Sequence, residues 1–317
     1  MKLVQATNGS ITRSISLPAV IAANQQATLY SKVTGYLKTI NVDKGDEVKA
    51  GALLAEIEAP ELLADAARFK AESEIAALDY QRASEAQAKA PDLILRQEVD
   101  TTKAKAATAK ANLERAQTLL GFTRLAAPFS GTVTRRLVDP GAFVPAATAG
   151  SSPQNAALLT LSDFKVVRVQ VTVPEPEVPR IRNGLPVKIT LEELPSITFT
   201  GSITRSAQAL DEATRTMLTE IDLENANHQL RPGMYATAKI GVETHEGALL
   251  LPVEAVVFEK AGISVFTIAD NKAKRVVVKA GFNDGEKVEI LDGVARETPV
   301  ILVGKMTLSN GQLVQVK

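Results

Sequence analysis

Two alanine-rich stretches flank Pro91. They are residues 62–90, LLADAARFKAESEIAALDYQRASEAQAKA, and residues 93–120, LILRQEVDTTKAKAATAKANLERAQTLL. In both, small or apolar residues recur at alternating spacings of four and three, which is the pattern of a coiled-coil seam. We therefore predict two antiparallel helices joined at a proline turn. Each helix would be about 42 Å long at 1.5 Å per residue.

The predicted seam consists mostly of small side chains. In the first helix it comprises Leu62, Ala66, Phe69, Ser73, Ala76, Tyr80 and Ala83. In the second it comprises Leu95, Val99, Thr102, Ala106, Ala109, Leu113, Ala116 and Leu120. Because burial stabilises by only about 0.8 kcal/mol per CH₂ group, an alanine seam contributes little. We expect the hairpin to depend on helix propensity and on neighbouring copies.

The segments on either side of the hairpin form an internal repeat. Residues 33–61 read VTGYLKTINVDKGDEVKAGALLAEIEAPE, and residues 129–146 read FSGTVTRRLVDPGAFVPA. An offset of 96 (131 − 35 and 141 − 45) relates their glycines, Gly35 to Gly131 and Gly45 to Gly141. After an insertion, residues 52–54 match residues 157–159. We infer two halves of one β-domain, split by the hairpin.

The rest of the chain has the pattern of short strands separated by turns. A small antiparallel barrel is expected, followed by a second β-domain that the N-terminal strand joins. The predicted boundaries are 1–28 for the N-terminal strands, 29–61 with 122–163 for the split domain, 62–121 for the hairpin, 164–246 for the barrel and 247–317 for the last domain.

Composition excludes several classes of function. Lys+Arg and Asp+Glu are both 36, and this balance argues against nucleic acid as a partner. The chain has no cysteine, which excludes disulfides and thiolate sites. No Walker-type loop or G-x-S-x-G elbow occurs, so we expect no catalytic residue and no cofactor. The two histidines, His228 and His245, lie in a polar turn and a linker, where solvent exposure without metal is expected.

Four stretches, taken in order, resemble the periplasmic adaptors, or membrane fusion proteins (HlyD-like family), of resistance-nodulation-division (RND) efflux pumps. They are the half-motif pair, the hairpin, the barrel segment that closes with LRPGMYATAKI (230–240), and LLLPVEAVV (249–257). The resemblance covers nearly the whole chain. It implies a mainly β, elongated multidomain fold, in which a coiled-coil hairpin, a lipoyl-like β-sandwich, an antiparallel β-barrel and a membrane-proximal β-domain follow in series.

The resemblance also implies a non-enzymatic function. Such an adaptor bridges an inner-membrane transporter and an outer-membrane channel, self-associates as a trimer to hexamer, and serves the export of small molecules or metal ions. It resides in the periplasm, held to the inner membrane by a lipid or N-terminal anchor that this chain lacks. An adaptor of an ABC-type exporter or a type I secretion system is the alternative.

The hairpin tip is the candidate site for docking the channel. Related adaptors carry an Arg, a Leu four positions later and then a Ser; Arg82 fits, but Ala86 and Leu95 stand at the other two positions. The candidate partner-binding residues are Arg82, Lys89, Pro91, Asp92, Leu93, Ile94 and Arg96. A second set is expected to form structural turns, namely Gly35, Gly45, Gly131, Gly141, Arg215, Pro232 and Gly233.

A lipoyl or biotinyl carrier is the competing interpretation of the split domain. Carriers attach their cofactor to a lysine at an exposed turn, just after the acidic residue that Glu58 matches. In this chain the stretch reads Ala59-Pro60-Glu61 and continues into the first helix. With no lysine at that place, we expect no covalent cofactor.

Overall fold

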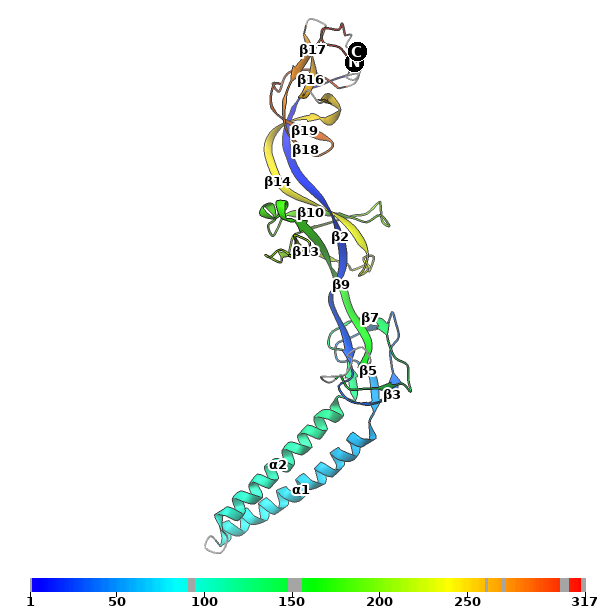
Figure 1. The fold of residues 1–317 in the computed structure, drawn as a ribbon, viewed down its shortest axis with the longest axis vertical. Coiled ribbons are helices and arrows are strands. Elements are labelled where there is room, and N and C mark those ends of the chain that lie inside the picture. Colours follow the sequence, from blue (N-terminus) through cyan, green and yellow to red (C-terminus); the bar gives the residue numbers. More distant parts are fainter. Residues whose placement is uncertain are drawn as a thin grey trace. The chain divides into compact units, whose positions relative to one another are not determined.

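The computed structural model describes residues 2–90, 95–147, 156–259, 262–269, 272–302 and 308–314. These residues fold into two compact units (Figure 1). One unit comprises Ala23–Val166, and the other comprises Met1–Ala22 together with Val167–Lys317. The unit Ala23–Val166 combines short strands with two long helices that lie side by side, and strands predominate in the other unit. The predicted class, mainly β with a helical hairpin, is confirmed.

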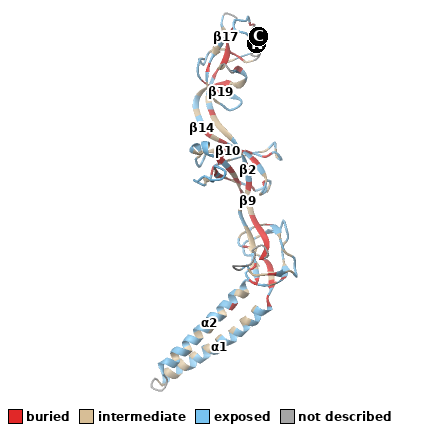
Figure 2. Ribbon diagram, viewed as in Figure 1, coloured by how far each residue is buried: buried red, intermediate tan, exposed pale blue. Residues whose placement is uncertain are grey.

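The hairpin consists of α1 (Pro60–Lys89) and α2 (Arg96–Gly121). At 1.5 Å per residue, its 30-residue and 26-residue arms are about 45 and 39 Å long. Among the described residues of both helices, Ala116 alone is buried, and Figure 2 shows the arms mostly exposed or half-buried. No helix in the described part of the chain is long and apolar enough to cross a membrane.

The predicted seam is confirmed along both helices, with one exception. Every predicted seam residue of α1 is half-buried, and those of α2 from Val99 to Leu120 are half-buried or buried. Leu95 was placed in the seam wrongly, because its side chain is 73% exposed. It occupies the N-cap of α2 with extended backbone angles (φ −68°, ψ 133°), so helical periodicity no longer applies to it.

Two sheets form the β-domain at the base of the hairpin. Its strands are β3 (Gly35–Ile40), β4 (Glu47–Val48), β5 (Leu53–Glu58), β6 (Arg124–Ala126), β7 (Gly131–Arg136) and β8 (Phe143–Val144). One sheet has the order β6-β5-β3-β8, while β7 pairs with β4 and with β9 (Ala157–Pro174). Leu37, Leu54, Val133, Leu159 and Leu161 are almost wholly buried in its core.

The barrel region belongs to the other unit and is built on long strands. Its strand order is β11-β10-β14-β2-β9-β13-β12. The bounds are β2 (Thr7–Tyr30), β10 (Pro186–Thr190), β11 (Thr198–Ser202), β12 (Arg205–Ser206), β13 (Thr216–Glu224) and β14 (Tyr235–Pro252), with the short 3-10 helix η2 (Glu175–Arg180). Alternate residues of β13 are buried, from Met217 to Leu223, so one face of the strand packs into the core.

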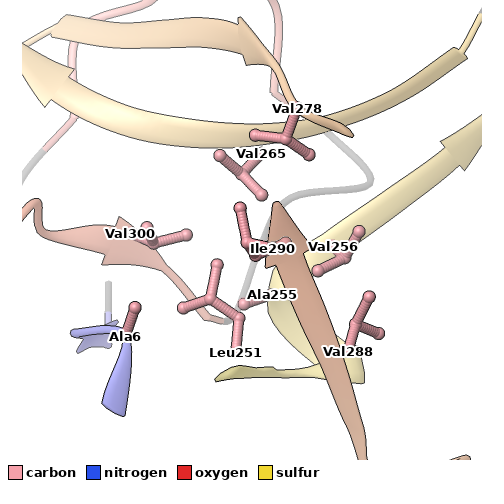
Figure 3. Close-up of a cluster of buried hydrophobic side chains, with 9 residues drawn as sticks. All are labelled: Ala6, Leu251, Ala255, Val256, Val265, Val278, Val288, Ile290 and Val300. Carbon is pink, nitrogen blue, oxygen red and sulfur yellow. The ribbon is translucent and has the colours of Figure 1, made fainter. Parts of the chain in front are cut away.

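The C-terminal strands enclose a separate aliphatic core. They are β15 (Val256–Glu259), β16 (Gly262–Ala269), β17 (Lys272–Val277), β18 (Lys279–Asn283), β19 (Lys287–Asp292) and β20 (Val300–Ile301), after the short 3-10 helix η3 (Val253–Ala255). The N-terminal strand β1 (Leu3–Val4) pairs with β20. Figure 3 shows the core, whose side chains converge from β14, η3 and strands β15, β16, β19 and β20, with Ala6 and Val278 from the segments beside them.

Candidate functional site

The two half-motifs at the base of the hairpin bond to each other in a matched way. The Gly45 N–H donates to the carbonyl of Val133 at 2.8 Å, and the Gly141 N–H donates to the carbonyl of Leu37 at 2.7 Å. The return bonds, both 2.9 Å, run from Leu37 N–H to Ala142 and from Val133 N–H to Asp46. The offset of 96 that relates the sequences (141 − 45) therefore also relates the hydrogen bonds.

Gly35 and Gly131 occupy equivalent close approaches between strands. A Cβ atom on Gly35 would lie 2.4 Å from the carbonyl oxygen of Glu58. A Cβ atom on Gly131 would lie 2.6 Å from the carbonyl oxygen of Ser162. In both places the obstacle is backbone, which cannot move aside as a flexible side chain would. Both half-motifs thus require glycine for the same reason.

The third strand of the repeat was aligned incorrectly from the sequence. The sequence pattern matches residues 52–54 to residues 157–159, an offset of 105 (157 − 52). Opposite the equivalent residues of β3 and β7, however, β5 places Ile57 and β9 places Leu161, an offset of 104 (161 − 57). Both segments contain consecutive leucines, so an insertion of either length gives a plausible match in sequence.

The hairpin leaves this domain directly after Glu58, the last residue of β5. Ala59 is 3% exposed and forms the N-cap of α1, and Pro60 is the first helical residue, where its missing N–H is tolerated. The chain thus enters a helix at the place where a carrier domain would present its lysine on a turn. This stretch has no side chain that can form an amide with lipoate or biotin.

Exposed side chains gather towards the far end of the hairpin. Arg82 and Lys89 on α1 and Arg96 at the start of α2 are all exposed, as is Leu95. Ala86, which stands where related adaptors have leucine, is half-buried. The remaining candidates, Pro91, Asp92, Leu93 and Ile94, lie outside the described residues. The described tip residues 82–89 and 95–96 therefore present three cations, the exposed carboxylate of Glu85 and one exposed leucine.

The candidate turn residues of the barrel adopt turn geometry. Arg215 has φ +54°, and its N–H donates to the carbonyl of Asp211 at 2.9 Å. The Asp211 carboxylate accepts the N–H of Thr214 at 2.8 Å, and this bond holds the pKa of Asp211 below its usual value. Gly233, which follows Pro232, has φ +96°, a conformation that favours glycine. In the base domain, Gly45 and Gly141 likewise have φ +98° and +86°.

Both histidines are half-buried, which differs from the solvent exposure that the sequence predicted, but His228 does lie in a polar turn and the His245 side chain is still 40% exposed. His245 does not lie in an exposed linker. Its Nδ1 is 2.9 Å from Oε1 of Glu289, and its ring stacks on Phe282 at 4.1 Å between centroids. Within the described ranges, no three or more His, Asp and Glu side chains gather in a way that could hold a metal ion.

Three family models match the chain in succession. Residues 25–156 match the barrel-sandwich hybrid domain of RND membrane fusion proteins. Residues 167–244 match the CusB-like β-barrel domain, and residues 248–316 match the C-terminal permuted SH3-like domain of YknX. The first match includes the hairpin together with most of the two half-motifs.

Similarity to known proteins also extends over most of the chain. Multidrug resistance protein MdtA of Klebsiella pneumoniae is 26% identical over 330 residues, covering 98% of this chain and 79% of that protein. The protein of the same name from Yersinia pseudotuberculosis is 28% identical over 340 residues, covering 98% and 74%. A MacA-MexA chimera containing the Pseudomonas aeruginosa MexA α-hairpin domain has the same fold, with a TM-score of 0.74 at 20% identity over 95% of this chain and 99% of that one.

Domain matches, relatives and fold agree with the repeat, the inserted hairpin and the barrel described above. These matches support an adaptor of efflux pumps rather than an enzyme. The chain thus has, in succession, domains of the kind found in the membrane fusion proteins, the periplasmic adaptors of RND efflux pumps.

Proposed function

We propose that this adaptor bridges an inner-membrane RND transporter and an outer-membrane channel, and so serves the export of small molecules or metal ions from the cell. The observation that carries the proposal is the position of the hairpin between two bonded half-motifs, with the barrel and C-terminal domains following in the same chain. The two relatives named for multidrug resistance, each similar over 98% of this chain, support small molecules as cargo.

The hairpin tip is the proposed docking site for the channel. Arg82, Lys89 and Arg96 are exposed, and Leu95 is a large apolar side chain left 73% exposed. A partner that covers this leucine removes apolar surface from water, and this burial favours binding at the tip. Pro91, Asp92, Leu93 and Ile94 complete the proposed site by sequence.

Lateral packing between copies is proposed for the arms of the hairpin. Ile75 and Leu78 are three residues apart on α1, and they are 61% and 50% exposed. Their spacing places them on one side of the helix, where a neighbouring copy can cover both. We take a trimer to hexamer as the assembly in the pump.

The barrel and C-terminal domains are proposed to face the transporter, in the periplasm. The proposed boundaries of the parts remain those drawn from the sequence, with the barrel at 164–246 and the membrane-proximal domain at 247–317. An ABC-type exporter or a type I secretion system stays the alternative, because the description of the family model that matches residues 248–316 does not name RND proteins.

The test is complementation of a strain that lacks the adaptor, using Leu95→Asp. Leu95 is an N-cap without a side-chain cap, and Asp is among the preferred N-cap residues. The substitution should therefore keep or raise helix stability, by about 0.5–1 kcal/mol, while it removes the apolar contact. We expect loss of tolerance to exported compounds at an unchanged protein level.

Leu63→Asp is the matched control. Leu63 is 57% exposed in the opening turns of α1, and a carboxylate near a helix N-terminus is tolerated. This variant should retain full tolerance. Full tolerance with Leu95→Asp, or equal loss with both variants, would contradict docking through the tip.

A further inference from the structure

His245 lies at a joint in β14. Two family models match this unit. The first ends at residue 244, and the second begins at residue 248. The ladder between β14 and β2 is interrupted between His245 and Ala248, and Gly247 within the interruption has φ +70°. A bulge with a left-handed glycine is a point where a strand bends. The strand therefore has one of its two register shifts directly after His245, and the other lies between Gly241 and Glu243.

The His245 side chain ties this point to the C-terminal domain. Its Nδ1 lies 2.9 and 3.1 Å from the two carboxylate oxygens of Glu289 on β19. Its ring stacks on Phe282 of β18 with an interplanar angle of 23°. Glu289 is only 5% exposed, whereas the His245 side chain is 40% exposed, so the bond joins a buried carboxylate to an imidazole that solvent can still reach.

The surroundings of Glu289 are shaped to hold a carboxylate. The ladder between β18 and β19 shifts register between Ala280 and Asn283, and the Phe282 N–H inside this shift donates to Glu289 Oε2 at 3.0 Å. A Cβ atom on Gly281 would lie 2.2 Å from the same oxygen. The absence of a side chain at Gly281 thus leaves the space that the carboxylate fills.

Acidic groups dominate the charge around the imidazole. On β14 itself, Glu243 Oε1 lies 3.7 Å from His245 Nε2, and β19 supplies Glu289. On β2 the residue opposite His245 is the buried Ile11, and the nearest cation along that strand, Arg13, is paired with Glu177 at 3.1 Å. From β18 the imidazole meets the uncharged ring of Phe282.

This environment favours the charged forms of both partners. The hydrogen bond to Glu289, with smaller contributions from both carboxylates, raises the pKa of His245 above its usual value. Burial alone would raise the pKa of Glu289, but the Phe282 N–H and His245 outweigh it and lower that pKa.

We propose that His245 and Glu289 form a proton-dependent clamp across the joint between the barrel and the C-terminal domain, closed in mildly acidic medium and weakened when His245 loses its proton. A closed clamp holds β14 against β18 and β19 beside its bulge. An open clamp leaves the bulge free to bend. The adaptor would then stiffen as the surrounding compartment acidifies.

The direction of the pH effect follows from linkage. A raised pKa for His245 means that its contribution is complete below the ordinary histidine value of about 6.5 and is lost as the pH rises through the higher folded value. A lowered pKa for Glu289 means that its contribution is complete above the ordinary value of about 4.3 and is lost as the pH falls through the lower folded value. The clamp is therefore strongest between these two ordinary values.

The first measurement is a proton NMR titration of the unsubstituted full chain. The chain has only two histidines, so spectra of His228→Gln assign both resonances. We expect His245 to titrate above the ordinary histidine value and Glu289→Gln to remove that upward shift. A His245 that titrates at or below the ordinary value overturns the proposal, whatever the variants do.

The second measurement is hydrogen exchange of residues 244–252 at pH 6 and pH 8.5, corrected for the intrinsic dependence of exchange on pH. We expect greater protection at pH 6 in the full chain and in His228→Gln, the matched control. His245→Gln should lose this dependence. Protection that responds to pH equally in His245→Gln shows that another group is responsible and rejects the clamp.

Discussion

The β-domain at the base of the hairpin and the hairpin itself are stabilised in different ways. In the β-domain, Leu54, Leu159 and Leu161 have no exposed surface, and backbone bonds are matched between the two half-motifs. Among the described residues of the hairpin, Ala116 alone is buried. Packing therefore specifies the base, whereas local helix propensity and partners specify the arms. The exposed surface of the arms is not needed for folding, so it is available for binding to partner proteins.

The largest expected difference between the two regions concerns leucine truncation. Leu54→Ala should destabilise the β-domain by about 2–5 kcal/mol, because it removes buried methyl groups and leaves a cavity. Leu78→Ala on α1, where the side chain is 50% exposed, should change stability by no more than about 0.5 kcal/mol. Urea unfolding of the two variants measures both effects, and equal costs would remove the distinction between the regions.

A smaller effect tests the symmetry inside the base. Gly35→Ala and Gly131→Ala each force a Cβ atom onto a carbonyl oxygen, so each should cost about 1–3 kcal/mol. The two costs should agree closely, since the repeat gives both glycines the same role. Gly121→Ala at the end of α2 is the control, because nothing lies within 4 Å of the added atom and stability should be unchanged or slightly higher. Thermal unfolding compares the three, and a clear inequality between the first two would contradict the shared role.

Local periodicity made the hairpin predictable, and the prediction of its seam failed only where the helical periodicity ended. The seam from Leu62 to Ala83 could be inferred because spacing along one helix determines which residues share a face. Leu95 continues the spacing in sequence, but it lies at an N-cap, where the backbone is extended and not helical. Glycine spacing revealed the repeat, because close approaches and left-handed turns restrict those positions to glycine.

Contacts between distant residues could not be predicted in the same way. His245 appeared to lie in an exposed linker because its partner Glu289 is 44 residues away and belongs to another strand. A histidine just before a Gly-containing bulge was the available signal, but strand pairing was needed to identify the carboxylate. The third strand of the repeat was misplaced by one residue for a related reason, since pairing to β3 and β7 fixes its register.

In-cell cross-linking at the hairpin tip tests the central claim most directly. The chain has no cysteine, so Lys89→Cys and Lys110→Cys each introduce a unique thiol, one near the tip and one on the arm of α2. With a thiol-directed photo-cross-linker attached, we predict a covalent adduct with an outer-membrane channel from Lys89→Cys and none with that channel from Lys110→Cys. No channel adduct from the tip, or equal adducts from both positions, would contradict docking of the channel by the hairpin tip.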